Sequence, residues 1–185
     1  MLNKQRVFKS VLGLALLSAG SMASAAIVTG GTVHFTGQIV NAACAVSADS
    51  TNQTVNMGQY RTAHFTSVGT RSNAVPFTIK LEDCDTTVST QASTAFSGSA
   101  NATDPTVLTV SNTSGGASGT ASGVGIEISD RIGQVLKPDG ANFSNAQTLI
   151  DGANVLAFNA RYKSVAAAVT PGQANADATF TMQYN

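Results

Sequence analysis

The sequence is poor in the residue types on which most catalytic and ligand-binding chemistry depends. Of its 185 residues, 11% are charged and 6% are aromatic, which is low for a soluble enzyme. It contains two histidines, His34 and His64, which are too few for a convincing metal site. No G-x-S-x-G turn, P-loop or dinucleotide-binding glycine motif occurs, and nothing in the composition suggests a nucleic-acid partner. The sequence therefore predicts no enzyme, no cofactor and no small-molecule substrate.

Long apolar runs are also scarce, and the clearest one lies near the N terminus. Three basic residues precede an apolar stretch at residues 11–17, and small residues follow up to Ala25. A membrane-spanning helix needs roughly 20 apolar residues, so this stretch is too short to be one. The pattern predicts a signal peptide over residues 1–25, with cleavage after Ala25 or Ala23, and hence an exported mature chain.

Cysteine is scarce as well, since only Cys44 and Cys84 occur and both lie in the mature part. An exported chain meets an oxidising compartment, where two cysteines pair more readily than they bind a metal. We therefore predict a disulfide. Closing a loop of about 40 residues should stabilise the fold by roughly 4 kcal/mol in the chain-entropy model.

The chain is rich in short segments that alternate apolar and polar residues, separated by clusters of Gly, Ser, Asn and Thr. This period of two is typical of β-strands, and no segment shows a long helical period. One short helical turn is expected near residues 60–65. The pattern predicts an all-β sandwich in a single domain, residues 39–185. The predicted strands cover residues 54–57, 75–81, 106–110, 124–128, 155–162 and 178–184.

The segment directly after the signal, residues 26–38, has a mostly apolar face and a mostly polar face. The first of these faces is formed by Ile27, Thr29, Gly31, Val33 and Phe35. No tight-turn signal joins this strand-like segment to the next one, so its apolar face needs a partner. An ordinary first strand in the chain's own sandwich is the alternative interpretation.

The C terminus has a penultimate tyrosine, Tyr184, and a glycine fourteenth from the end, Gly172, with Phe180 and Met182 alternating between them. This signature and several other stretches resemble the type 1 fimbrial major subunits, the rod-forming members of the chaperone-usher pilins. The resemblance covers essentially the whole mature chain. The other matching stretches, in the same order as in the family, are residues 30–35, 40–46, 81–86, 130–133, 160–162 and 170–180.

The resemblance implies an incomplete immunoglobulin-like sandwich that lacks its last strand and is completed by a donor strand from a neighbouring subunit or a chaperone. Residues 26–38 would be the donor extension, with Ile27, Val33 and Phe35 entering pockets and Gly31 fitting where no side chain has room. Gly172, Phe180, Met182 and Tyr184 would mark the C-terminal strand that a chaperone pairs with.

The implied partners are identical subunits in a helical filament, a periplasmic chaperone and an outer-membrane usher. The implied location is a fimbria on the bacterial surface, reached through the periplasm. Two alternatives stay open: a minor adaptor or terminator pilin of the same system, and a sugar-binding adhesin module.

Overall fold

The structure is a computed structural model that describes residues 28–112 and 119–185. Contacts between residues divide the chain into two units, residues 1–38 and 39–185. In the first unit, residues 28–38 are exposed and form no helix or strand. The described helices and strands all belong to the second unit, and none of these helices is long and apolar enough to cross a membrane.

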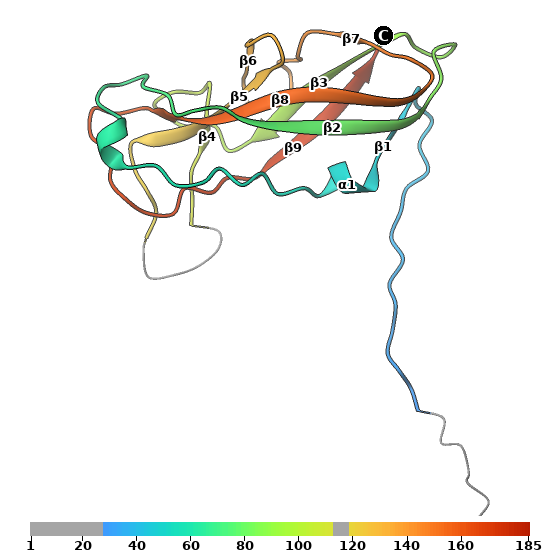
Figure 1. The fold of residues 1–185 in the computed structure, drawn as a ribbon, viewed down its shortest axis with the longest axis horizontal. Helices are drawn as coiled ribbons and strands as arrows, with labels where there is room; N and C mark the ends of the chain where they lie inside the picture. The colour runs from blue at the N-terminus through green and yellow to red at the C-terminus, as the bar shows by residue number, and fades with distance from the viewer. Residues whose placement is uncertain (1–27, 113–118) are drawn as a thin grey trace, which may run out of the picture. The chain divides into compact units, whose positions relative to one another are not determined.

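The second unit consists of two antiparallel sheets (Figure 1). The larger sheet has the strand order β1-β2-β8-β5-β4, with β6 also paired to β5, and the smaller has the order β7-β3-β9. Two short helical elements, α1 (Ala48–Thr51) and η1 (Thr62–His64), follow β1. The strands are β1 (Ala45–Val46), β2 (Val75–Cys84), β3 (Gln91–Gly98), β4 (Leu108–Thr109), β5 (Val124–Asp130), β6 (Val135–Leu136), β7 (Gln147–Thr148), β8 (Gly152–Ser164) and β9 (Ala178–Tyr184).

Aromatic side chains join the two sheets face to face. Phe77 of β2 and Phe158 of β8 stack with ring centroids 5.6 Å apart. Phe96 of β3, in the other sheet, meets Phe158 edge to face at 5.2 Å and Phe77 at 6.0 Å. Edge-to-face aromatic pairs add stability beyond the area they bury. These rings form the centre of a core shared by both sheets.

The all-β sandwich is confirmed, and β2, β5, β8 and β9 lie where alternation predicts strands. The predicted helical turn is η1. Residues 54–57 differ, because they form no ladder with another strand. The sequence also failed to indicate β3, whose residues Ala92–Phe96 are all buried. Small Ala, Ser and Thr side chains let β3 pack closely within the core, but they hide the alternation that identifies a strand.

The disulfide between Cys44 and Cys84 is confirmed. A bulge in β2 makes it possible: pairing with β8 shifts register between Leu81 and Cys84, and Asp83 adopts a left-handed φ of 51°. Strict alternation from buried Leu81 would turn Asp83 inward, whereas the bulge turns Cys84 inward instead. Asp is among the residues that tolerate this backbone conformation.

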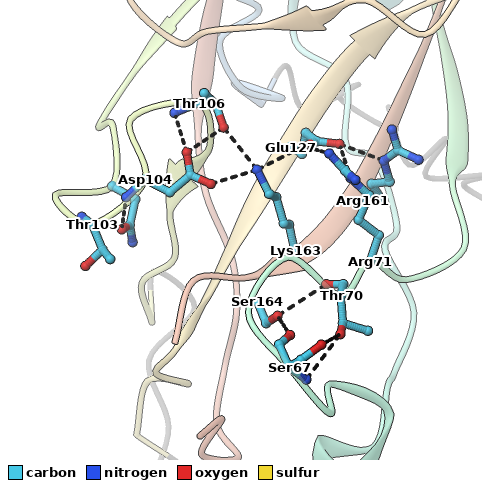
Figure 2. Close-up of polar contacts among 11 residues, drawn as sticks. Ser67, Thr70, Arg71, Thr103, Asp104, Thr106, Glu127, Arg161, Lys163 and Ser164 are labelled. Carbon is cyan, nitrogen blue, oxygen red and sulfur yellow. Dashed lines mark hydrogen bonds and ion pairs between the residues drawn. The ribbon is translucent and has the colours of Figure 1, made fainter. Parts of the chain in front are cut away.

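A buried carboxylate, Glu127 on β5, is surrounded by cations (Figure 2). Arg71 binds it through two hydrogen bonds of 2.9 Å, and Arg161 of β8 through one of 2.8 Å. Lys163 lies 3.5 Å from Glu127 and 2.7 Å from Asp104. Burial would raise the pKa of Glu127, but its bonds to Arg71 and Arg161 outweigh burial and hold that pKa below its usual value. The carboxylate stays ionised. Through Arg71, Arg161 and Lys163 it links β5 to β8 and to the segments that contain Arg71 and Asp104.

Removal of the disulfide should lower the free energy of unfolding by roughly 4 kcal/mol, because the unfolded chain regains the freedom of a large loop. The test is chemical unfolding of Cys44→Ser/Cys84→Ser beside the wild type. A reducing agent should shift the wild-type midpoint to that of the variant and leave the variant unchanged. Equal midpoints for the two oxidised proteins would contradict the prediction.

Asp104 should make stability depend on pH in acid. Burial would raise its pKa, but hydrogen bonds from Lys163 and Thr106 outweigh burial and lower the pKa from 3.8 to about 2. Because the folded-state pKa is the lower one, ionised Asp104 stabilises the fold above about pH 4 and loses this effect as the pH falls toward about 2.

Thermal unfolding of Asp104→Asn should therefore show a lower midpoint than the wild type near neutral pH, and the difference should shrink as the pH approaches about 2. Asp49→Asn, which removes an equal charge from an exposed position, is the matched control. A difference for Asp104→Asn that is the same at every pH would contradict the prediction.

Candidate functional site: an open strand edge

β9 is the last strand of its sheet and, among the described strands, pairs only with β3. At its end, Asn185 and Gln91 exchange two backbone hydrogen bonds of 3.0 Å. Hydrogen-bonded and non-hydrogen-bonded pairs alternate along an antiparallel ladder, so every second residue of β9 turns its N–H and C=O away from β3. Phe180, Met182 and Tyr184 are among these residues, and no described strand pairs with them on that side.

The same three residues point their side chains toward the core, yet each is only half-buried. The Phe180 ring lies 6.5 Å from Phe96, and the Thr94 hydroxyl donates to Met182 Sδ at 3.2 Å. The Tyr184 hydroxyl donates to the carbonyl oxygen of Cys44 at 3.2 Å. Apolar side chains and unpaired backbone groups thus occur together along one edge of the fold.

A second segment without a strand partner, residues 53–61, runs between α1 and η1. Val55, Met57 and Tyr60 are half-buried while their neighbours are exposed, and Met57 and Tyr60 pack against the core. This segment therefore has the side-chain pattern of a strand but no ladder. β9 and residues 53–61 are together called the open edge below.

Contacts at both ends fix the chain segments that lead into the two halves of the open edge. At one end, Tyr184 bonds to Cys44. At the other, Tyr60 meets Tyr162 edge to face at 5.7 Å, and the Tyr162 hydroxyl donates to the carbonyl of Ala174 at 2.9 Å. Burial raises the pKa of the Tyr162 and Tyr184 hydroxyls, so both remain protonated donors. The chain from residue 44 to 60 and the chain from 174 to 184 consequently run in opposite directions.

These contacts define two ends of the domain. The disulfide end holds the Cys44–Cys84 bridge, residue Asn185 and the turns at residues 85–90 and 149–151. The η1 end holds η1, the turn at residues 67–70 and the last residues of β8, 161–164. β8 connects the two ends, and its 13 residues span roughly 40 Å.

The structure brings some of the predicted site residues together and not others. Cys44 and Cys84 are bonded, and Phe180, Met182 and Tyr184 share one face of β9. Gly172 precedes β9, where a Cβ atom would overlap the backbone of Thr120 and Ala121, so its role in the fold is a close chain crossing.

The predicted donor residues lie in the first unit or outside the described residues. Thr29, Gly31, Val33 and Phe35 are exposed, with Val33 at 73% and Phe35 at 91% of their full exposure. Ile27 lies outside the described residues. The insertion of these side chains into a partner stays a prediction.

Sequence reasoning missed the half of the open edge formed by residues 53–61, together with Tyr162. Alternation at residues 54–57 was a visible signal for an extended segment, but nothing in it shows that the segment lacks a partner. Among the described residues, no three His, Cys, Asp or Glu side chains are grouped as metal ligands would be.

Comparisons with known proteins agree with this geometry. A family model described as "Fimbrial protein" matches residues 33–185. The chain is 59% identical over 157 residues to the fimbrial subunit type 1 of Salmonella typhimurium, covering 85% of this chain and 84% of that protein.

Two solved structures share the fold. One is a chain from a chaperone-usher pilus, with a TM-score of 0.70 and 29% identity, covering 88% of this chain and all of that one. The other is the P pilus rod subunit PapA, with a TM-score of 0.63 and 29% identity, covering 78% of this chain and all of that one. The fold is the immunoglobulin-like fold of chaperone-usher pilins, and subunits of this pathway are exported to form surface fimbriae. The chain therefore belongs to the fimbrial protein family and is a non-enzymatic structural subunit of a fimbria.

Proposed function

We propose that this chain is the major rod subunit of a type 1-like fimbria and polymerises by donor-strand exchange. Each copy would lend its extension, residues 26–38, to the open edge of another copy. The observation that carries the proposal is the unpaired side of β9, where Phe180, Met182 and Tyr184 turn their backbone groups away from β3. Addition of a strand to an exposed sheet edge is an established mode of recognition, and pilins are a known case of it.

Backbone pairing would supply affinity. Phe180, Met182 and Tyr184 each offer one N–H and one C=O on the unpaired side of β9, and residues 53–61 form no ladder with a described strand. A net contribution of about 1 kcal/mol for each hydrogen bond formed is typical. Because main-chain bonds do not depend on side-chain type, a chaperone strand can pair with β9 first and the extension of another subunit can replace it.

Side chains would supply register. Ile27, Val33 and Phe35 share one face of the extension, and each would contribute roughly 1.5–3 kcal/mol on burial against the half-buried side chains of the open edge. A slip by one residue would turn Val33 and Phe35 to solvent, so the register should be strongly fixed. The nine residues 27–35 span roughly 27 Å, slightly less than the roughly 33 Å from Ala174 to Tyr184.

The direction of insertion follows from the requirement that a filament must grow. The extension leaves each domain at Ile39, close in sequence to the disulfide end. If extensions also entered acceptors at that end, successive domains would crowd their disulfide ends together and could not form an open chain. Insertion from the η1 end gives a repeating head-to-tail contact and places the donor strand antiparallel to β9.

Chaperone and usher are the partners that this proposal requires. A subunit with an open edge exposes apolar surface and unpaired backbone groups, which invites aggregation until a strand covers them. A periplasmic chaperone would cover β9 during transit, and an outer-membrane usher would be the site of exchange.

The assembly state of the purified protein tests strand donation. The intact mature chain and a chain lacking residues 27–35 are each prepared with and without the cognate chaperone. Heat-resistant multimers should form from the intact chain alone, because only it has a strand to donate. Equally stable monomers of both chains without chaperone would overturn the proposal.

Single substitutions sharpen this test. Phe35→Asp places a charge on the inserted face and should abolish the multimers, whereas His34→Asp, one residue away on the polar face, should retain them. Equal loss for both variants would mean that alternation of the extension does not determine insertion. Immunogold labelling then separates the roles, since a major subunit should be found along the whole filament and an adaptor or terminator only at an end.

A further inference from the structure

Two exposed apolar side chains lie in neighbouring turns at the disulfide end. Val88 and Ile150 are each 65% exposed, and they lie in two turns joined by hydrogen bonds. Thr86 donates to Asp151 Oδ1 from its backbone N–H at 2.8 Å and from its hydroxyl at 2.6 Å, and the Leu149 N–H donates to the Thr90 carbonyl at 2.9 Å. These bonds hold the turns together, so the two apolar side chains form a fixed surface.

The chain enters the domain at the same end. The carbonyl of Ala43 accepts a hydrogen bond of 2.9 Å from the N–H of Asp85, which anchors the start of the domain beside the first turn. Ile39 is fully exposed and Val40 is 50% exposed, a few residues upstream. Contiguous exposed apolar residues commonly mark an interaction surface.

The charge at this end is of one sign. The four carboxylates of Glu82, Asp83, Asp85 and Asp151 lie in or beside the two turns. Residues 39–46, 82–91 and 147–154 contain no Lys or Arg. The disulfide end is therefore acidic around an apolar centre.

The η1 end has the opposite character. Arg71, Arg161 and Lys163 gather there around two carboxylates, Glu127 and Asp104 (Figure 2). Arg61 is exposed next to η1, and Val68 is 63% exposed at the tip of the 67–70 turn. The turn is held to β8 by a hydrogen bond of 2.9 Å from the Gly69 N–H to the Ser164 carbonyl. This end is basic and also carries an exposed apolar side chain.

We propose that the disulfide end of each subunit docks against the η1 end of the copy that accepts its extension. This inference rests on the proposed strand donation, because insertion from the η1 end brings these two surfaces together. Eight peptide units separate Phe35 from Ala43, the first buried residue of the domain, so the donor's disulfide end lies within roughly 29 Å of the acceptor's η1 end. The acidic surface with Val88 and Ile150 then faces Arg61 and Val68 of the second copy.

The contact has two separable parts. Charges at an exposed rim act over a Debye length of roughly 8 Å at physiological salt and mainly speed encounter. Apolar burial does not depend on salt in this way and would restrict bending between successive domains. Charge complementarity would therefore change the rate of assembly. Burial of the apolar side chains would change the stiffness of the filament.

The rate test uses full-length mature subunits in complex with the chaperone, followed as heat-resistant dimers at about 50 mM and about 500 mM NaCl. The wild-type initial rate should fall roughly threefold to tenfold at the higher salt. Glu82→Lys and Arg61→Glu should each slow the reaction at low salt, and the double variant Glu82→Lys/Arg61→Glu should recover most of the rate. Arg131→Glu, an equal charge change on an exposed residue of the β5–β6 turn, should behave like the wild type.

The stiffness test compares Ile150→Ser with Ile132→Ser, a similarly exposed isoleucine in the β5–β6 turn. Filaments of Ile150→Ser should bend more in electron micrographs, and those of Ile132→Ser should match the wild type. Multimers that form at a salt-independent rate, with no rescue by the double variant, would overturn the docking inference and leave strand donation standing. Absence of multimers from the wild type would instead overturn strand donation itself.

Discussion

The structure depends on one unmet requirement: within the described part of the chain, the backbone of β9 is hydrogen-bonded on only one side. Phe180, Met182 and Tyr184 carry apolar side chains toward the core and unpaired N–H and C=O groups toward the open side. Polar backbone groups next to apolar surface are costly unless a partner satisfies them. An added strand with alternating apolar residues would pair the free backbone groups and cover the apolar side chains at once. The same strand would then complete the fold and join the subunits.

Stability is distributed unevenly around this edge. Away from it, Glu127 bonds with Arg71 and Arg161, three phenylalanines join the sheets, and the disulfide closes one end. Along the open edge, the inward-facing side chains are only half-buried, and residues 53–61 form no ladder with a described strand. Regions with few buried contacts open at low free energy, so in the proposed function the rigid part would hold the open edge in a form that a partner strand can recognise.

Most of the fold could be predicted from the sequence where side chains alternate clearly, as in β2, β5, β8 and β9. The disulfide followed from two cysteines in an exported chain. β3 could not be predicted, because its small side chains do not alternate between apolar and polar. Residues 53–61 could not be identified as part of the open edge, because the sequence does not show that they lack a neighbouring strand. The burial of Glu127 also left no local signal, since Arg71 and Arg161 are distant in sequence. The donor role of Val33 and Phe35 stays a prediction, because both side chains are exposed and contact no part of the fold that would show where they insert.

The antiparallel placement of an inserted strand along β9 has a mechanical consequence for a filament built as proposed. Tension along such a filament would pull the extension lengthwise past its neighbours, so the ladder bonds would be loaded together in shear instead of being peeled apart one by one. Failure would then require many bonds to break in a single event, and the lifetime under load would be governed by the unfolding rate of the acceptor domain. A fibre joined only by non-covalent contacts could in this way bear sustained pulling forces.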